Sequence, residues 1–185
     1  MNEEKAVLEF FSQPENLHLA LSVGSRIEEI CEQMNSRFWR DLKQRVDALP
    51  GDMQTETIED HNAEEILLGL RCKPDQPCCL SPILEQQHIG GKWRIFQGLA
   101  WQGAPALPSP PAVSKLKHEL ESAGCRSNEH FLAWKWTDLY PRRSDFLLEY
   151  AQQPGKLLLK AESALFMGDH LELINNANAA LAEKD

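Results

Sequence analysis

The stretch HIGGKWRIFQGLAW (residues 88–101) decides the fold class. Gly90 and Gly91 are the two-residue signal of a tight β-hairpin, because glycine adopts the backbone angles of such turns without strain. The residues after the turn alternate between two faces. One face carries Trp93, Ile95, Leu99 and Trp101, and the other carries Arg94, Phe96 and Ala100. The stretch therefore predicts an antiparallel pair of strands over residues 79–89 and 92–101.

Two further stretches predict strands on either side of this hairpin. EEILLGLRC (64–72) is short and apolar, and the turn sequence KPDQP (73–77) joins it to the hairpin. Residues 130–137 alternate again, with Trp134 and Trp136 on one side and Phe131 on the other. Pro82 has no N–H, which favours an edge position or a bulge for its strand. The sequence predicts an α+β fold with an antiparallel meander of about four strands.

Helical patterns flank the predicted sheet. The clearest begins with a capping box of Ser25 and Glu28 and ends at Pro50-Gly51. Its apolar stripe consists of Ile27, Ile30, Cys31, Met34, Phe38, Leu42, Val46 and Leu49. Further helices are predicted over 3–12, 15–23, from a Ser109 cap to Gly124, over 142–152, and over 155–183 with a kink or split at Gly168-Asp169. We expect a helical segment at 1–24 and a single α+β domain at 25–185.

Composition limits the classes of protein. The 185 residues carry a formal net charge of −9, which disfavours strong binding to duplex nucleic acid. No apolar run approaches 18 residues, and the acidic N-terminus is not a signal peptide, so we expect no membrane span. The five cysteines do not form a disulfide pattern, which favours a reducing, cytoplasmic location. Cys72, Cys78 and Cys79 lack a usual zinc spacing.

Aromatic residues gather in HFLAWKWTDLYP (130–141). Their period of two favours core packing, with Trp134 and Trp136 turned inward against Phe38 and Trp39 of the long helix. A protein-contact surface and a ligand platform, including Tyr140, are the alternatives.

Chemical motifs are weak. Glu59, Asp60 and His61, and separately Asp169, His170 and Glu172, have the donor types of a hard-metal site. Neither set has convergent partners in the sequence, and no phosphate loop, G-x-S-x-G or H-E-x-x-H motif occurs. We therefore predict no catalytic, cofactor or metal residues. We assign an interaction or ligand surface to Trp134, Trp136, Tyr140, His61 and His170.

The order of motifs resembles a known family. FWRDLKQRV (38–46) ends the long helix, strands with a Gly-Gly turn follow, and W-x-W-x-D-L-Y (134–140) precedes a helical tail (147–181). Over roughly residues 25–183 this resembles the C-terminal, non-catalytic region of some bacterial proteins of the PD-(D/E)XK nuclease superfamily. The nuclease chemistry needs an Asp/Glu-x-Lys on a strand after an acid. None follows Pro74-Asp75, and Asp41-Leu42-Lys43 lies on a helix, so the resemblance implies an accessory region.

The leading hypothesis is a non-enzymatic bacterial interaction or accessory protein of an immunity, antitoxin-like or defence-associated kind. It would bind another protein, or itself as a homodimer, because the helical stripe is wide enough to serve a dimer. One alternative is an enzyme whose pocket joins His61, His88, His130 or His170 to a Cys or an acid. Another is a nucleic-acid-handling module, which predicts that Arg and Lys gather on one face.

Overall fold

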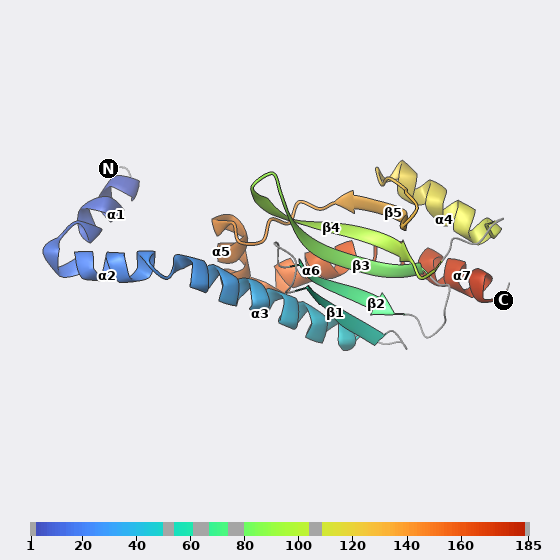
Figure 1. Cartoon of the computed structure of the whole chain (residues 1–185), viewed down its shortest axis with the longest axis horizontal. Coiled ribbons are helices and arrows are strands. Elements are labelled where there is room, and N and C mark those ends of the chain that lie inside the picture. Colours follow the sequence, from blue (N-terminus) through green and yellow to red (C-terminus); the bar gives the residue numbers. More distant parts are fainter. Residues whose placement is uncertain (1–2, 50–53, 61–66, 74–79, 104–108, 184–185) are drawn as a thin grey trace.

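The fold is α+β, as predicted. The structure, a computed structural model, describes residues 3–49, 54–60, 67–73, 80–103 and 109–183. The described helices are α1 (Glu3–Phe11), α2 (Pro14–Gly24), α3 (Ile27–Asp47), α4 (Pro111–Ser122), α5 (Ser144–Gln152), α6 (Pro154–Leu165) and α7 (Leu171–Ala182). The strands are β1 (Gln54–Asp60), β2 (Leu67–Lys73), β3 (Leu80–Ile89), β4 (Lys92–Trp101) and β5 (Phe131–Trp136) (Figure 1).

The five strands form an antiparallel meander in the order β1-β2-β3-β4-β5. The predicted hairpin is confirmed: Ile89 pairs with Lys92, and Gly90 and Gly91 have φ of 59° and 74°. The expected number of about four strands is wrong by one. β1 has the sequence QTETIED, in which Ile58 is the one large apolar side chain, so its apolar periodicity is too weak to detect.

Pro82 lies in the middle strand of the sheet, not at an edge as predicted. It pairs with Leu99 in the β3–β4 ladder. The β2–β3 register ends at Arg71 and Ile83, so the pairing with β2 stops at the residue that directly follows the proline. The missing N–H therefore falls where the ladder on that side has already stopped.

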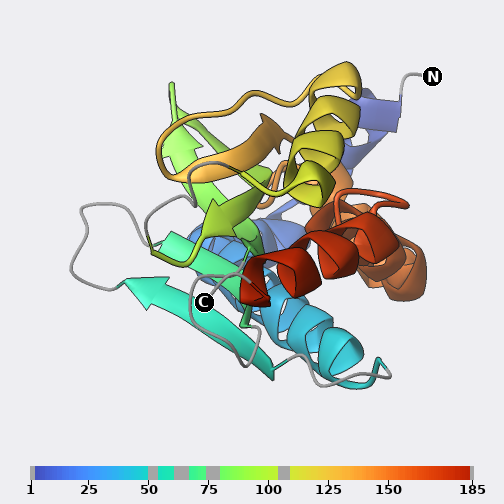
Figure 2. The same cartoon turned by 90° about the vertical axis from the view of Figure 1, so that its right-hand side faces the viewer.

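The helices that contact the sheet pack on one of its faces, as the end-on view shows (Figure 2). One core cluster joins α3, α5 and α6 to Leu70, Leu84 and Ile95 of the strands. A second joins α4 and α7 to Leu80 and Leu99. The opposite face of the sheet has no described helix on it, and we call it the open face.

The C-terminal half of α3 supplies the centre of the first core. Phe38 is fully buried and makes edge-to-face contacts with Trp39, Phe146 and Tyr150 at centroid distances of 5.4, 5.1 and 5.7 Å. The indole Nε1 of Trp39 donates to Gln86 on β3 at 3.1 Å. These contacts fix the helix on the sheet.

Several predicted boundaries need correction. α3 begins at Ile27 without a side-chain cap, because Ser25 has helical backbone angles (φ −70°, ψ −13°) instead of the extended ones of an N-cap. The N-cap of α4 is Pro110, not Ser109. The split near Gly168 is confirmed: its φ of 80° separates α6 from α7. Pro50-Gly51 lie outside the described residues.

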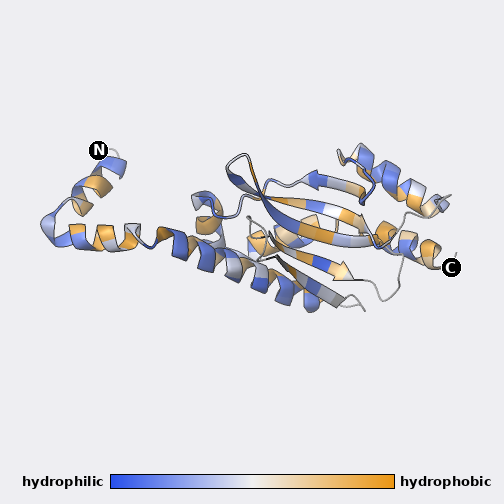
Figure 3. Ribbon diagram, viewed as in Figure 1, coloured by the Kyte–Doolittle hydropathy of each residue, from blue (hydrophilic) through white to orange (hydrophobic). Residues whose placement is uncertain are grey.

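The N-terminal part of the chain leaves the body as an extension (Figure 1). We define residues 3–30, which comprise α1, α2 and the first turn of α3, as the arm. α1 and α2 bury no residue. Of the large apolar side chains that the structure exposes, nine lie on the arm, at 41–68% exposure: Val7, Leu8, Phe10, Leu17, Leu19, Leu21, Val23, Ile27 and Ile30 (Figure 3). Within the described chain, the apolar stripe of the long helix thus packs against the core from Cys31 onward, and Ile27 and Ile30 stay exposed.

Gly69 is required by the close approach of two strands. A Cβ at this position would lie 2.6 Å from the carbonyl oxygen of Leu84 and 3.2 Å from Ile58 Cδ1. We expect Gly69→Ala to lower the free energy of unfolding by about 1–3 kcal/mol, because the backbone must shift to accept the methyl group. Urea unfolding measures this. Gly155→Ala, which meets no atom within 4 Å, should not destabilise the chain; equal losses in both variants would contradict the packing.

Candidate protein-contact surface

Four aromatic side chains cluster on the open face of β4 and β5. Phe96 pairs with Trp136, and Gly98 pairs with Trp134 in the β4–β5 ladder. Because paired residues share a face of the sheet, Phe96, Trp134 and Trp136 point the same way. Phe131 joins them, with its ring 5.7 Å from that of Phe96. We call the cluster of Phe96, Phe131, Trp134, Trp136, Tyr140 and Arg94 the aromatic face.

The prediction that Trp134 and Trp136 turn inward against the long helix is wrong. Both rings are partly exposed and neither belongs to a core cluster. The prediction that Phe131 and Trp134 lie on opposite faces of the sheet is also wrong. A register shift between Leu99 and Ala100 brings Ala100 opposite Phe131, which places both rings on the open face. Of the remaining predicted core aromatics, Phe38 and Trp39 are buried as expected.

The rings pack edge to face. Trp134 and Trp136 lie 6.4 Å apart at 86°, and Phe96 meets Trp136 at 5.8 Å and 81°. Gly98 makes room for this packing, since a Cβ there would lie 2.8 Å from Phe131 Cδ1. The cluster is therefore a preformed surface, because each ring is held by its neighbours.

Arginine side chains lie over the aromatic rings. The guanidinium of Arg94 lies 4.8 Å from the Trp136 ring centroid and 5.4 Å from that of Tyr140. Arg143 covers Tyr140 at 5.1 Å. Such contacts combine charge attraction with apolar burial. The Arg94 Nε is buried and has no hydrogen-bond partner among the described residues.

Arginines that are not neutralised lie beside the rings, although the chain as a whole is acidic. No carboxylate of the described residues forms an ion pair with Arg94 or with Arg126, which lines a hollow beside Trp134 and Trp136. By contrast, Arg143 pairs with Asp145 at 2.8 Å and Arg142 with Glu28 at 2.7 Å. Two arginines near the rings are thus free to meet an acidic group from outside the chain.

The rings also border a groove of about 300 Å³. Its walls are Gln87, Ile89, Phe96, Asn128, Phe131, Trp134 and Trp136. None of the wall residues is ionisable, so the groove offers no acid–base or metal chemistry of its own. Its apolar walls suit side chains of a partner.

Of the other predicted site residues, the structure brings Tyr140 to this surface and places His170 elsewhere. Tyr140 belongs to the aromatic face, but His170 lies before α7, where its Nδ1 is 2.7 Å from the carbonyl oxygen of Met167. His61 lies outside the described residues. Glu59 and Asp60, expected in a loop, are the last two residues of β1. Within the described part of the chain, no three His, Cys, Asp or Glu residues are grouped to hold a metal ion.

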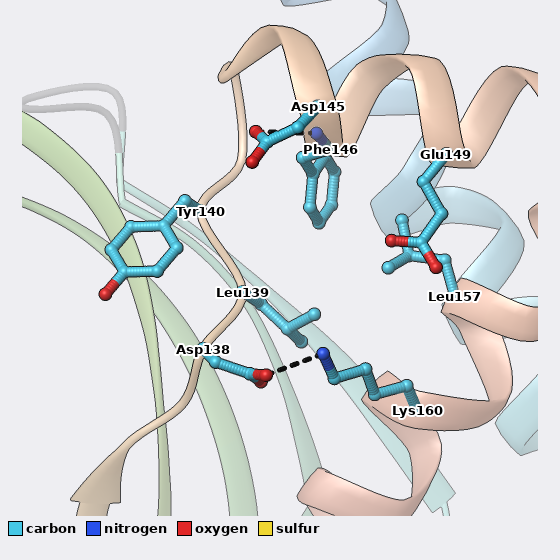
Figure 4. A pocket seen from close by; sticks show the side chains of 8 residues that line it. All are labelled: Asp138, Leu139, Tyr140, Asp145, Phe146, Glu149, Leu157 and Lys160. Atoms are coloured by element: carbon cyan, nitrogen blue, oxygen red, sulfur yellow. Dashed lines mark hydrogen bonds and ion pairs between the residues drawn. The ribbon is translucent and has the colours of Figure 1, made fainter.

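A second hollow, between the segment after β5 and helices α5 and α6, contains acids (Figure 4). Its volume is only about 70 Å³. Asp138 pairs with Lys160 at 2.7 Å, and Glu149 pairs with Lys156 at 3.1 Å. Because these carboxylates are neutralised and the space holds little more than water, it is a poor candidate for a substrate pocket.

Comparison with known proteins gives no relative. No protein-family model, no curated protein and no solved structure matches the chain. No helix among the described residues is long and apolar enough to cross a membrane. The candidate site therefore rests on the geometry of the aromatic face alone.

The cysteines differ in reactivity because their burial differs. Burial, with a smaller contribution from the charge of Asp47, raises the pKa of the fully buried Cys72 to about 12. Cys31 on α3 is only partly buried. We expect iodoacetamide at pH 8 to modify Cys72 on the order of 100-fold more slowly than Cys31 in the folded chain, since the thiolate is the reactive form. Peptide mapping by mass spectrometry measures both rates; similar rates before unfolding would contradict the buried position.

Proposed function

We propose that the chain is a non-enzymatic interaction protein that binds another protein through the aromatic face. One observation carries the proposal: partly exposed Phe131, Trp134 and Trp136 lie beside arginines that have no carboxylate partner in the described chain. Tryptophan, tyrosine and arginine are the residue types that dominate the energy of protein interfaces. Here they form a rigid cluster on a sheet face that the described helices leave open.

The chemistry of the surface defines the partner. The groove has apolar walls that suit apolar side chains. Arg94 and Arg126, beside the rings, can donate hydrogen bonds to carboxylates. The partner segment we propose is therefore acidic and apolar, with its acids beside the groove. A cytoplasmic location is part of the proposal, because Cys31, Cys72 and Cys125 are free thiols. The proposal also includes the accessory role that the resemblance to nuclease-associated regions implies.

Single-stranded nucleic acid is the other class of ligand that aromatic and arginine side chains bind. Bases stack on flat ring faces. Trp134 and Trp136 instead meet edge to face at 86°, and Arg94 already covers Trp136. The net charge of −9 also opposes a polyanion. The geometry therefore favours a protein partner.

A display experiment tests the proposal. Random helical peptides are selected on the full chain, and the enriched peptides are tested against Arg94→Glu. We expect enrichment of acidic peptides with apolar residues, and loss of their binding to the variant. A labelled single-stranded oligonucleotide is the counter-probe. Enrichment of basic peptides, unchanged binding to the variant, or tighter binding of the oligonucleotide would overturn the proposal.

A further inference from the structure

The apolar side chains of the arm have no element packed over them among the described residues. Leu17 and Leu21 lie on one side of α2, at 46% and 66% exposure, and Leu19 and Val23 lie on the opposite side, at 54% and 45%. A helix that is apolar on opposite sides is normally buried. The nine exposed apolar side chains of the arm present on the order of 800 Å², about what each partner contributes to a standard protein interface.

The arm cannot fold back onto its own aromatic face. It continues into α3, a single helix of 21 residues whose C-terminal half is fixed to the helix-covered side of the sheet by Phe38, Trp39 and Leu42. Figure 1 shows that α2 carries the chain away from the body in the direction of α3. A partner that buries the apolar side chains of the arm must therefore come from another molecule.

The charge of the arm matches the charge of the aromatic face. Residues 3–30 contain six Glu, one Lys and one Arg, a formal net charge of −4. The middle of the arm, NLHLALSVGS (16–25), has no acidic or strongly basic residue and is rich in leucine. This is the acidic and apolar segment that the proposed function requires. An anionic lipid surface would repel the same acids.

We propose that the aromatic face binds the arm of a second copy of this chain, so that two copies exchange arms. The inference rests on the proposed function and names its partner. The leucines of α2 lie along the groove beside Trp134 and Trp136, and glutamates of the arm meet Arg94 and Arg126. One two-fold axis relates the two contacts, since each copy supplies one arm and one face.

Side-by-side pairing of the two arms is the competing arrangement. It would bring two segments of charge −4 together without the arginines of the sheet. Like charges at that distance disfavour association. The exchange instead places each acidic arm beside Arg94 and Arg126, and each aromatic face receives one arm.

Light scattering after size exclusion tests the exchange with the full chain. We expect the wild type to have twice the monomer mass of 21.0 kDa. Leu21→Glu on the arm and Arg94→Glu on the face should each give monomers. Circular dichroism verifies that both remain folded, and Trp136→Ala serves as a second face variant if Arg94→Glu is misfolded.

Mixing the two variants is the decisive step. The Leu21→Glu chain keeps an intact face and the Arg94→Glu chain keeps an intact arm, so their mixture should restore a heterodimer through one of the two contacts. A monomeric wild type, or a dimer that persists in the face variants, would overturn the exchange. In either case the peptide selection still decides whether the face binds proteins, so the two failures are distinguishable.

Discussion

Replacing Phe38 by alanine is expected to lower the free energy of unfolding by about 3–5 kcal/mol. The ring is fully buried and touches three aromatic neighbours, Trp39, Phe146 and Tyr150. Its removal leaves a cavity where α3 and α5 meet. Thermal unfolding should show a fall in Tm on the order of 10 °C for a chain of this length.

Phe10 provides a matched control for this experiment. It is the same residue type, but its side chain lies on the arm and is 51% exposed. Phe10→Ala should change the stability by less than about 0.5 kcal/mol in the monomeric Leu21→Glu background, where the arm has no partner. A large loss in the Phe10 variant together with a small loss in the Phe38 variant would mean that the core has been placed wrongly.

Replacing Trp136 by alanine is expected to weaken the binding of a selected acidic peptide at least about 30-fold, or about 2 kcal/mol. Trp136 contacts Phe96 and Trp134, and it supports the guanidinium of Arg94 at 4.8 Å. Truncation therefore removes ring area from the groove and also releases the arginine. Isothermal titration calorimetry measures the dissociation constant with and without the substitution in the Leu21→Glu background, where no arm occupies the face.

The control for this prediction lies on the helical side of the molecule. Leu159 on α6 is 53% exposed and lines neither the groove nor the aromatic face. Leu159→Ala should leave the dissociation constant unchanged. If it weakens binding as much as Trp136→Ala does, the partner binds the helical side and the assignment of the surface is wrong.

Periodicity predicted most of the elements. The hairpin at Gly90-Gly91, the strand at 131–136 and the long helix all follow from spacings of two or of three and four. β1 was not predicted, because a polar edge strand such as QTETIED has too few apolar residues to show an alternating pattern. The apolar stripe predicted which side of α3 packs against the core, but it could not show that the packing begins only at Cys31, after the exposed Ile27 and Ile30.

The aromatic face could not be predicted from the sequence for a specific reason. Alternation assigns faces only along an uninterrupted ladder, and the register shift between Leu99 and Ala100 changes the face of Phe131 relative to Trp134. A signal was nevertheless present. Gly98 lies within an apolar strand, and glycine there often marks a close approach of another group. In this chain the group is the ring of Phe131.

The central claim is that the open face of the sheet binds the partner, and the tryptophans report on it directly. Trp134 and Trp136 lie on the aromatic face, while the indole N–H of Trp39 is buried against Gln86 on the other side. We therefore follow the indole N–H signals of the ¹⁵N-labelled Leu21→Glu chain, in which no arm occupies the face, by NMR during titration with a selected acidic peptide. The signals of Trp134 and Trp136 should shift and that of Trp39 should stay. A shift confined to Trp39, or no shift during saturable binding, would contradict the claim.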